Sequence, residues 1–261
     1  MVLARAKVMA LQTVSFPGAA VEPVALDLLC VAPHPDDAEM GVGGVLALCA
    51  RAGARVGVLD LTRGELASNG TPQERLREGA EAAATLGLTW RGQLGLPDRG
   101  LHGAAAIVEL VGALRRTRPA LVLIPHAEDP HPDHGAAGHL TREAVFSAGL
   151  RRAAGPEWAA GAAATRPRGV LQYCINGWTL PAIAIDVTAV YEVKRRALRA
   201  HASQFGPADV PTRLNTGQAL AQVEARDRYL GASVGAAFAE GLLPVGPLRL
   251  DVAALLGVCR G

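Results

Sequence analysis

The chain has 261 residues, half of them hydrophobic and 4% aromatic, and its net charge is +2. This combination excludes an intrinsically disordered protein. The sequence has no Lys/Arg run, so its charge does not indicate a nucleic-acid or membrane-surface partner. The longest apolar stretches, such as 45–50 and 252–256, are far shorter than the ~20 residues that cross a bilayer. Composition therefore predicts a soluble α/β domain of enzyme size.

The cysteines are far apart and form no CxxC pair: Cys30, Cys49, Cys174 and Cys259. Arg5 and Lys7 precede a short apolar run, but Gln12 interrupts it and no small-residue cleavage pattern follows. We therefore expect a protein of the reducing cytoplasm without a secretory signal.

Segments typical of strands and helices alternate along the chain. The expected strands are 25–32, 54–61, 89–94, 120–124, 170–174 and 183–187. The expected helices are 43–51, 72–86, 104–117, 135–148, 190–203 and 217–231. Segment 151–168 holds Gly and Pro among alanines and predicts a surface loop with room for a helical turn. The alternation predicts βαβ units, a mostly parallel sheet and a single domain.

The best-defined helix start lies at Thr71. Thr71 can cap the helix, Pro72 suits its first position, and Glu74 can complete a capping box. Gly87 is expected to end this helix.

Two segments that follow expected strands share an unusual composition. Residues 33–39 read PHPDDAE and residues 126–134 read HAEDPHPDH, and together they hold four of the 7 histidines. Ligands of open α/β sheets bind beyond the carboxyl ends of the strands. The two loops are therefore the candidate site.

A metal ion is the first interpretation of these loops. His34, Asp37 and His134 could reach one cation, and two imidazoles with one carboxylate suit zinc while leaving positions open. Ferrous iron accepts a similar set. Asp36, next to a ligand, is placed to take a proton from the attacking water and pass it to a leaving group. Asp133 could hydrogen-bond His131 and favour an imidazolium that stabilises an oxyanion.

Purely structural interpretations exist for each loop alone. A single His-Pro-Asp can be a turn whose Asp caps the next helix, and Asp133 to Gly135 can simply begin a helix. Two such loops after strands of one domain favour the functional interpretation.

The glycines of Gly41-Val42-Gly43-Gly44 suggest a different class of protein, a nucleotide-binding regulatory module. The spacing lacks the final glycine of a dinucleotide fingerprint, and residues 34–37 occupy the turn where the pyrophosphate loop should lie. We expect these glycines to let the helix approach the sheet closely. Asp60 would be the ribose acid of a nucleotide site, and otherwise a loop-capping residue.

With these two loops and the further motifs given below, the sequence resembles the PIG-L/LmbE superfamily of zinc-dependent N-acetylglucosaminide deacetylases. Within it, the chain is most similar to the bacillithiol-pathway N-acetylglucosaminyl-malate deacetylases. The resemblance runs from about Asp27 to Leu255. The motifs that carry it are DDAEMG (36–41), DLTRGEL (60–66), SNGT (68–71), LPDRGL (96–101), HPDH (131–134), FSAG (146–149), ING (175–177) and SQF (203–205).

The resemblance implies zinc ligation by His34, Asp37 and His134, with Asp36 as general base and then acid and His131 as the group that stabilises the oxyanion. It also implies a Rossmann-like three-layer fold and a homo-oligomer, a trimer or hexamer. In this scheme residues 27–261 form the deacetylase domain, and residues 1–26 form an N-terminal extension that can supply an edge strand.

Substrate contacts are implied less directly. Arg75 matches a family arginine that faces the site, although it could equally be a solvated helix charge, and Asn176 could bind substrate or simply form an Asn-Gly turn. Two positions depart from the family pattern: Pro130 replaces an arginine common before HPDH, and His201 stands where several relatives have tyrosine. His201 could contact substrate or serve as a structural histidine at a helix end.

These observations predict a metal-dependent hydrolase that removes the acetyl group from a small-molecule glucosamine conjugate, with N-acetylglucosaminyl-malate as the first candidate. A broader N-acetylglucosamine or chitooligosaccharide deacetylase is the alternative. Arg63, Arg75 and Arg99 lie in segments that can surround the site, which favours an anionic substrate. The shortage of aromatic residues predicts mainly polar recognition.

Overall fold

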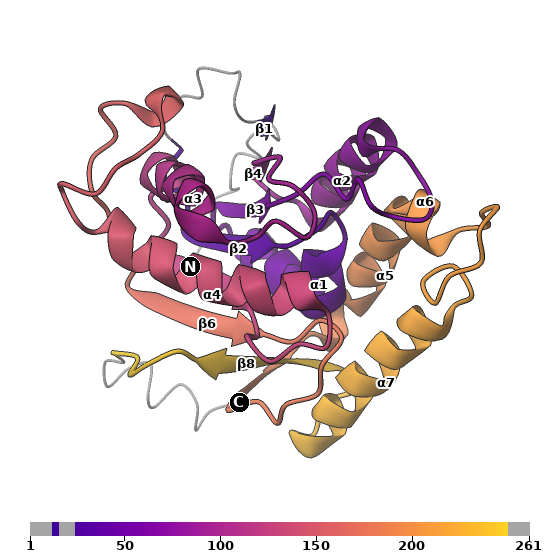
Figure 1. Ribbon diagram of the computed structural model, residues 1–261. Coiled ribbons are helices and arrows are strands. Elements are labelled where there is room, and N and C mark those ends of the chain that lie inside the picture. The colour runs from indigo at the N-terminus through magenta and orange to yellow at the C-terminus, as the bar shows by residue number, and fades with distance from the viewer. Residues whose placement is uncertain (1–11, 16–23, 250–261) are drawn as a thin grey trace.

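The computed structural model describes residues 12–15 and 24–249. An eight-stranded sheet in the order β1-β4-β3-β2-β5-β6-β8-β7 forms its centre (Figure 1). The strands are β1 (Gln12–Ser15), β2 (Leu28–Ala32), β3 (Val56–Asp60), β4 (Trp90–Gln93), β5 (Leu121–Pro125), β6 (Gly169–Tyr173), β7 (Ile183–Asp186) and β8 (Ala239–Pro244). The strands from β1 to β6 are mutually parallel, and β8 pairs antiparallel with both β6 and β7. The predicted α/β class, single domain and mostly parallel sheet are confirmed.

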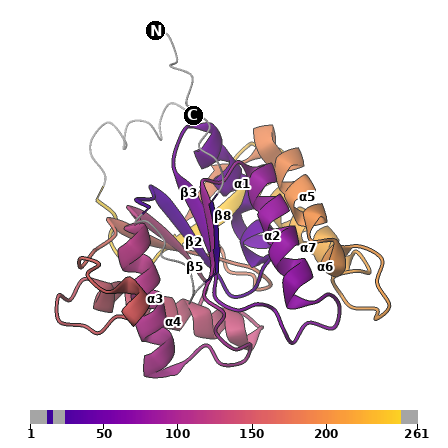
Figure 2. The ribbon, with the colours of Figure 1, turned by 90° about the horizontal axis from the view of Figure 1, so that it is seen from above.

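Helices cover both faces of the sheet. They are α1 (Asp37–Arg51), α2 (Pro72–Leu86), α3 (Gly103–Thr117), α4 (Pro132–Ala148), α5 (Tyr191–Ala200), α6 (Ala202–Phe205) and α7 (Gln218–Ser233), with short 3-10 helices at Glu157–Ala159 and Thr188–Val190. Figure 2 shows α3 and α4 on one face and the other α-helices across the sheet. The result is a three-layer fold. None of the helices in the described ranges is long and apolar enough to span a membrane.

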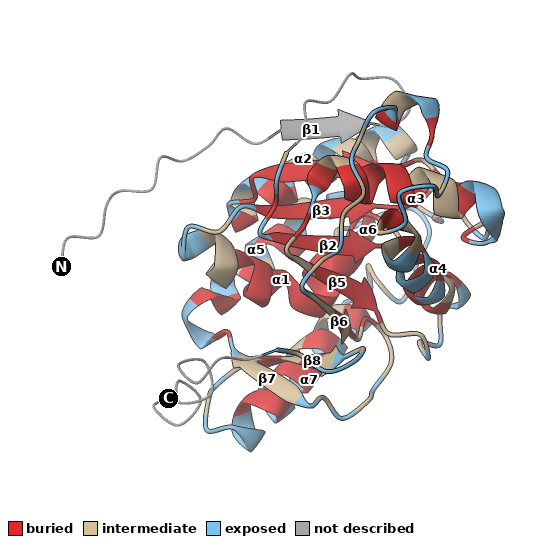
Figure 3. Ribbon diagram, turned by 90° about the vertical axis from the view of Figure 1, so that its left-hand side faces the viewer, coloured by how far each residue is buried: buried red, intermediate tan, exposed pale blue. Residues whose placement is uncertain are grey.

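The central strands are buried along their whole length. Every residue of β2 and β3 is buried, and Cys30 of β2 pairs with Val58 on one side and Leu123 on the other (Figure 3). Helices on both faces of a parallel sheet leave no solvated side, which explains the continuous apolar runs in these segments.

Helix α2 has the predicted ends. The Thr71 hydroxyl accepts a hydrogen bond from the Glu74 backbone N–H, the Glu74 carboxylate accepts one from the Thr71 N–H, and Gly87 closes the helix at φ 75°. All the determinants of these ends are local, and the helix bounds 72–86 are confirmed.

Helix α1 begins at Asp37, six residues before the predicted start at Gly43. Val42, at φ −143° and ψ 23°, breaks the regular helix and frees backbone N–H groups after it. The buried Glu240 carboxylate of β8 accepts hydrogen bonds from Gly44 N (2.9 Å) and Val45 N (2.7 Å). A side chain far away in the sequence therefore caps the second half of α1.

Glu240 belongs to a fully buried charge cluster. Lys194 of α5 donates at 2.6 Å to both Glu240 and Asp227 of α7, and the Tyr191 hydroxyl also donates to Asp227. A buried charge must be paired to remain ionised, and these pairs tie α5 and α7 to β8 and so to α1. The prediction of a single helix over 190–203 is wrong, because the helix is interrupted at His201, between α5 and α6.

Two glycines of α1 allow the close approach that was predicted. A Cβ atom at Gly41 would lie 2.3 Å from Tyr173 Cδ2, and one at Gly44 would lie 2.7 Å from Val187 Cβ. Asp60, by contrast, caps no loop: it is buried and receives hydrogen bonds from Arg91 Nε (2.8 Å) and Nη2 (3.0 Å).

Candidate metal centre and active site

The two histidine-containing loops meet beyond the carboxyl ends of β2 and β5, which are neighbours in the middle of the sheet. The loop after β2 ends at the start of α1, and the loop after β5 ends at the start of α4. Segments about a hundred residues apart in sequence are thereby brought together, as the parallel topology predicts.

The three predicted ligands are close enough to share one cation. Ligand atoms of His34, Asp37 and His134 all lie within 4.8 Å of one another. Asp37 lies between the two rings, with Oδ2 at 3.0 Å from His34 Nδ1 and Oδ1 at 3.3 Å from His134 Nε2. Two imidazoles and one carboxylate are a donor set that suits zinc and ferrous iron.

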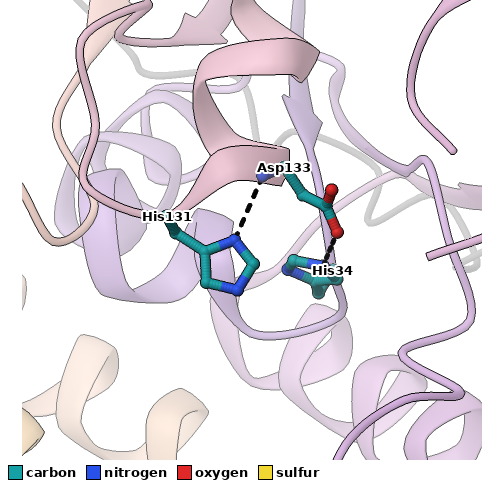
Figure 4. Close-up of side chains that lie close together, drawn as sticks. All are labelled: His34, His131 and Asp133. Atoms are coloured by element: carbon teal, nitrogen blue, oxygen red, sulfur yellow. Dashed lines mark hydrogen bonds and ion pairs between the residues drawn. The ribbon is translucent and has the colours of Figure 1, made fainter. Parts of the chain in front are cut away.

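A second group of possible ligands shares His34. His34, His131 and Asp133, the side chains drawn in Figure 4, also have ligand atoms within 4.8 Å of one another. Asp37 and His134 are both buried, whereas His131 is half-buried. Buried ligands with fixed partners are better preorganised, which favours the set with Asp37 and His134.

The electrostatics of the site favour a cation. Burial alone would lower the pKa of His34, but hydrogen bonds to Asp133 and Asp37 outweigh it and raise the pKa to about 10. Burial is likewise outweighed at His134, where Asp37 and Asp129 raise the pKa to about 9. The two rings thus stay protonated despite their burial, because the surrounding carboxylates stabilise positive charge at this position. A divalent cation can supply the same positive charge.

Asp129 is a site residue that the sequence did not reveal. Its Oδ1 lies 3.0 Å from His134 Nδ1 and accepts from His131 N at 2.9 Å. Its Oδ2 accepts from Asn176 N (2.9 Å) and Gly177 N (3.1 Å). Asp129 therefore orients His134 with Nε2 toward Asp37 and fixes the turn that carries Asn176. The only sequence signal was an acidic residue in the same loop as a candidate ligand.

Asp36 is buried and lies on strained backbone. Its φ of 125° is in the left-handed half of conformational space, which a non-glycine residue adopts only when its surroundings require it. Burial raises the pKa of its carboxyl to about 6, with Arg75 opposing this shift and Asp37 adding to it. A carboxyl with this pKa can both accept and return a proton near neutral pH.

Arg75 is buried, with only 3% of its surface exposed, which excludes the solvated helix charge considered above. Its Nη2 donates to Pro35 O (2.6 Å) and lies 3.3 Å from Asp36 Oδ1, and its Nη1 donates to Gly64 O (3.2 Å). Although Arg75 lines the cavity, its guanidinium is engaged in holding the loop that carries Asp36.

Gly64→Ala is expected to destabilise the protein by about 2–4 kcal/mol, because the new Cβ meets both a backbone and a packing conflict. Gly64 has φ +67°, and a Cβ there would lie 1.7 Å from Arg75 Nη1. Gly161→Ala is the matched control, since Gly161 has φ +78° but no atom within 4 Å of its Cβ position. The control should lose only about 1–2 kcal/mol. Urea denaturation measures both, and equal losses would show that contact with Arg75 is unimportant.

The predicted contact between the Asp133 carboxylate and the His131 ring is not formed. The Asp133 carboxylate lies 3.3 Å from His34 Nε2 and accepts from Arg99 N at 3.0 Å. His131 Nδ1 instead accepts the Asp133 backbone N–H at 3.2 Å (Figure 4). Burial, followed by the charge of His134, lowers the pKa of His131. The structure thus favours a neutral His131 with its proton on Nε2, rather than the predicted imidazolium.

A cavity of about 410 Å³ opens over these groups and has the size of a small-molecule site. Asn176 lines it, with its Nδ2 at 3.4 Å from His134 Nδ1. Arg99 and Arg213 also line it, whereas Arg63 does not. His201 is fully buried with its Nε2 at 3.5 Å from Glu39 Oε2, which supports the structural role considered for it.

Known proteins are similar to this chain in sequence and in fold. The PIG-L family pattern, described as GlcNAc-PI de-N-acetylase, matches residues 29–145. A diacetylchitobiose deacetylase of Thermococcus kodakarensis is 34% identical over 70% of this chain and 71% of its own length. A 1D-myo-inositol 2-acetamido-2-deoxy-alpha-D-glucopyranoside deacetylase of Rhodococcus jostii is 29% identical over 75% of this chain and 87% of its own.

A solved structure agrees with these matches. The crystal structure of a conserved protein from Thermus thermophilus has a TM-score of 0.77 and 39% identity, and the match covers 87% of this chain and 98% of that one. None of these similarities supports a nucleotide-binding regulatory module. Both histidine loops lie inside the range that matches the family pattern, and the chain belongs to the PIG-L family.

Proposed function

We propose that this protein is a metal-dependent hydrolase that removes the N-acetyl group from a glucosamine conjugate. The observation that carries the proposal is the group of His34, Asp37 and His134 beside the buried Asp36 in a cavity of about 410 Å³. The names of the relatives, which are deacetylases of acetamido sugars, support the same chemistry.

The donor set fits a divalent cation, with Zn²⁺ as our first choice and Fe²⁺ as the alternative. When bound, the cation would polarise the acetyl carbonyl and lower the pKa of water in the site. His34, Asp37 and His134 would hold it, and Asp129 keeps His134 in the required tautomer.

The remaining steps fall to the residues around the ligands. Asp36 takes a proton from the water that attacks the acetyl carbon, and the Nε2–H of His131 donates to the oxyanion that develops on the carbonyl oxygen. Asp36 then passes its proton to the amide nitrogen as the C–N bond breaks, which releases acetate and a free amine. Asp133 positions His131 through its backbone N–H and contacts His34 through its carboxylate.

For the substrate, we propose N-acetylglucosaminyl-malate. Arg99 and Arg213 line the cavity and could pair with the malate carboxylates, although Pro130 leaves no cation immediately before the HPDH motif. In this proposal the enzyme works in the reducing cytoplasm as a trimer or hexamer. A chitooligosaccharide deacetylase is the second candidate, favoured by the 34% identity with the diacetylchitobiose enzyme.

Acetate release from three compounds tests the proposal. N-acetylglucosaminyl-malate should give a kcat/KM at least about tenfold above that of N-acetylglucosamine, because each additional charge-assisted contact contributes on the order of 1.5–3 kcal/mol. A preference for diacetylchitobiose would support the second candidate. If the zinc-loaded enzyme releases no acetate from any of the three, the deacetylase proposal is wrong.

A further inference from the structure

A second cavity, of about 270 Å³, adjoins the catalytic one. The two share Met40 and Asn176 as lining residues. The rest of the second cavity is formed by the chain after β6 and by one side of α7. A ligand group attached to a sugar in the catalytic cavity could therefore extend past Met40 and Asn176 into this second space.

Two aromatic side chains stand at this second cavity. Trp178, in the β6–β7 connection, and Tyr229, on α7, have ring centroids 5.0 Å apart at an interplanar angle of 68°. They are 55% and 56% exposed, although large aromatic side chains normally bury most of their surface. The negative face of such a ring attracts the C–H groups on the apolar side of a saturated ring.

The lining of this second cavity carries no charge that is open to a ligand. The guanidinium of Arg226 donates to the backbone oxygens of Met40 (2.7 Å), Cys174 (3.0 Å) and Ile175 (2.9 Å) and to Asp227 (3.2 Å). The other polar groups of the lining side chains are the amides of Asn176 and Gln222, the Tyr229 hydroxyl and the indole N–H of Trp178. Aromatic faces with amides and a hydroxyl suit a neutral, hydroxylated ring better than a carboxylate.

The aromatic pair is fixed relative to the catalytic groups. Asp129, which orients His134, also holds the backbone of Asn176 and Gly177, immediately before Trp178. Gln222 Nε2 lies 3.4 Å from Asn176 O and links α7 to the same turn. One buried carboxylate thus sets both the candidate metal ligand and the start of the segment with Trp178.

We propose that Trp178 and Tyr229 form a subsite for a second, neutral ring of the substrate, a pyranose or a cyclitol joined to the N-acetylglucosamine unit. The inference rests on the proposed deacetylase function and adds a substrate class to it. Conjugates with anionic groups would use Arg99 and Arg213, whereas ring conjugates would use the aromatic pair. Recognition is then partly aromatic, contrary to the mainly polar recognition expected from composition.

The test compares diacetylchitobiose with N-acetylglucosamine in the wild type and in Trp178→Ala. We expect the ratio of kcat/KM for the disaccharide to that for the monosaccharide to fall at least about fivefold, since ring stacking contributes on the order of 1 kcal/mol beyond buried area. Trp178→Phe should restore most of the ratio. Phe146→Ala, which removes a 60% exposed aromatic residue from α4, is the matched control and should leave the ratio unchanged.

Binding without turnover separates this inference from the proposed function. Chitobiose, which has no acetyl group, should bind the wild type at least about fivefold more tightly than it binds Trp178→Ala in calorimetry, even if no acetate is ever released. Equal binding by the two proteins, or an unchanged kcat/KM ratio in Trp178→Ala, would overturn the subsite. Tighter binding of an alkyl glucoside than of chitobiose would also overturn it, because the cavity would then select an alkyl chain rather than a ring.

Discussion

Asp36→Asn should lower kcat by ~10²–10⁴-fold while the protein keeps its metal. The amide has nearly the shape of the carboxyl and can remain beside Arg75 Nη2, which lies 3.3 Å from Asp36 Oδ1. It cannot take a proton from water, however, so the deacetylation step loses its base and its acid together. Single-turnover kinetics of acetate release, with zinc content measured on the same sample, provide the test.

The neighbouring substitution is the control for this prediction. Asp37→Asn makes the same change in charge one residue further on, but it removes a carboxylate that lies between His34 and His134. This variant should lose metal as well as activity, and added zinc should restore part of the activity. If Asp36→Asn instead lost its metal while Asp37→Asn kept it, the roles of the two carboxylates would be exchanged. Near-wild-type kcat in metal-loaded Asp36→Asn would remove Asp36 from the mechanism.

The features that could be predicted from sequence are those encoded locally. The bounds of helix α2 follow from Thr71, Glu74 and Gly87, which determine its ends without help from distant residues. The meeting of the two histidine loops follows from the parallel strands, which place their carboxyl ends at one edge of the sheet. In both cases neighbouring residues and one topological rule are sufficient.

The features that could not be predicted depend on partners distant in sequence. Strand β8, with the sequence AEGLLP, contains Glu, Gly and Pro and does not have a strand-like pattern. It is stable in the sheet because Glu240 pairs with Lys194 and caps α1 at Gly44 and Val45. The backbone N–H groups that follow the kink at Val42 are satisfied by the same carboxylate, a contact that no local pattern indicates.

The candidate site divides in the same way. The ligand types at His34, Asp37 and His134 follow from the motifs, but the positioning groups do not. Sequence leaves Arg75 open as a solvated charge, and only the fold shows its guanidinium against Pro35 O. The contact predicted for Asp133 is wrong, because its backbone N–H, rather than its carboxylate, faces His131. Residue type thus indicates the chemistry of a site, whereas side-chain orientation depends on long-range packing.

Removal of the metal should abolish deacetylation, and the zinc concentration that restores the activity should depend on Asp129. Dialysis against a chelator is expected to lower activity by more than about 10³-fold, because the Lewis acid and the activated water are lost together. Titration with zinc should then restore it. Asp129→Asn should need ~10–100-fold more zinc for half-maximal recovery, the usual loss when the carboxylate behind a ligating histidine is removed.

The reason lies in the four hydrogen bonds of that carboxylate. Asp129 contacts the ring of His134 and the backbone N–H groups of His131, Asn176 and Gly177. An amide oxygen can accept only part of this set, and without the negative charge the His134 ring no longer has a fixed tautomer with Nε2 free for metal. Glu128→Gln, the same change at the adjacent residue, has no such contacts to lose and should leave the zinc titration unchanged. Identical titrations for Asp129→Asn and the wild type would exclude Asp129 from the metal site, and full activity in the presence of chelator would exclude the metal itself.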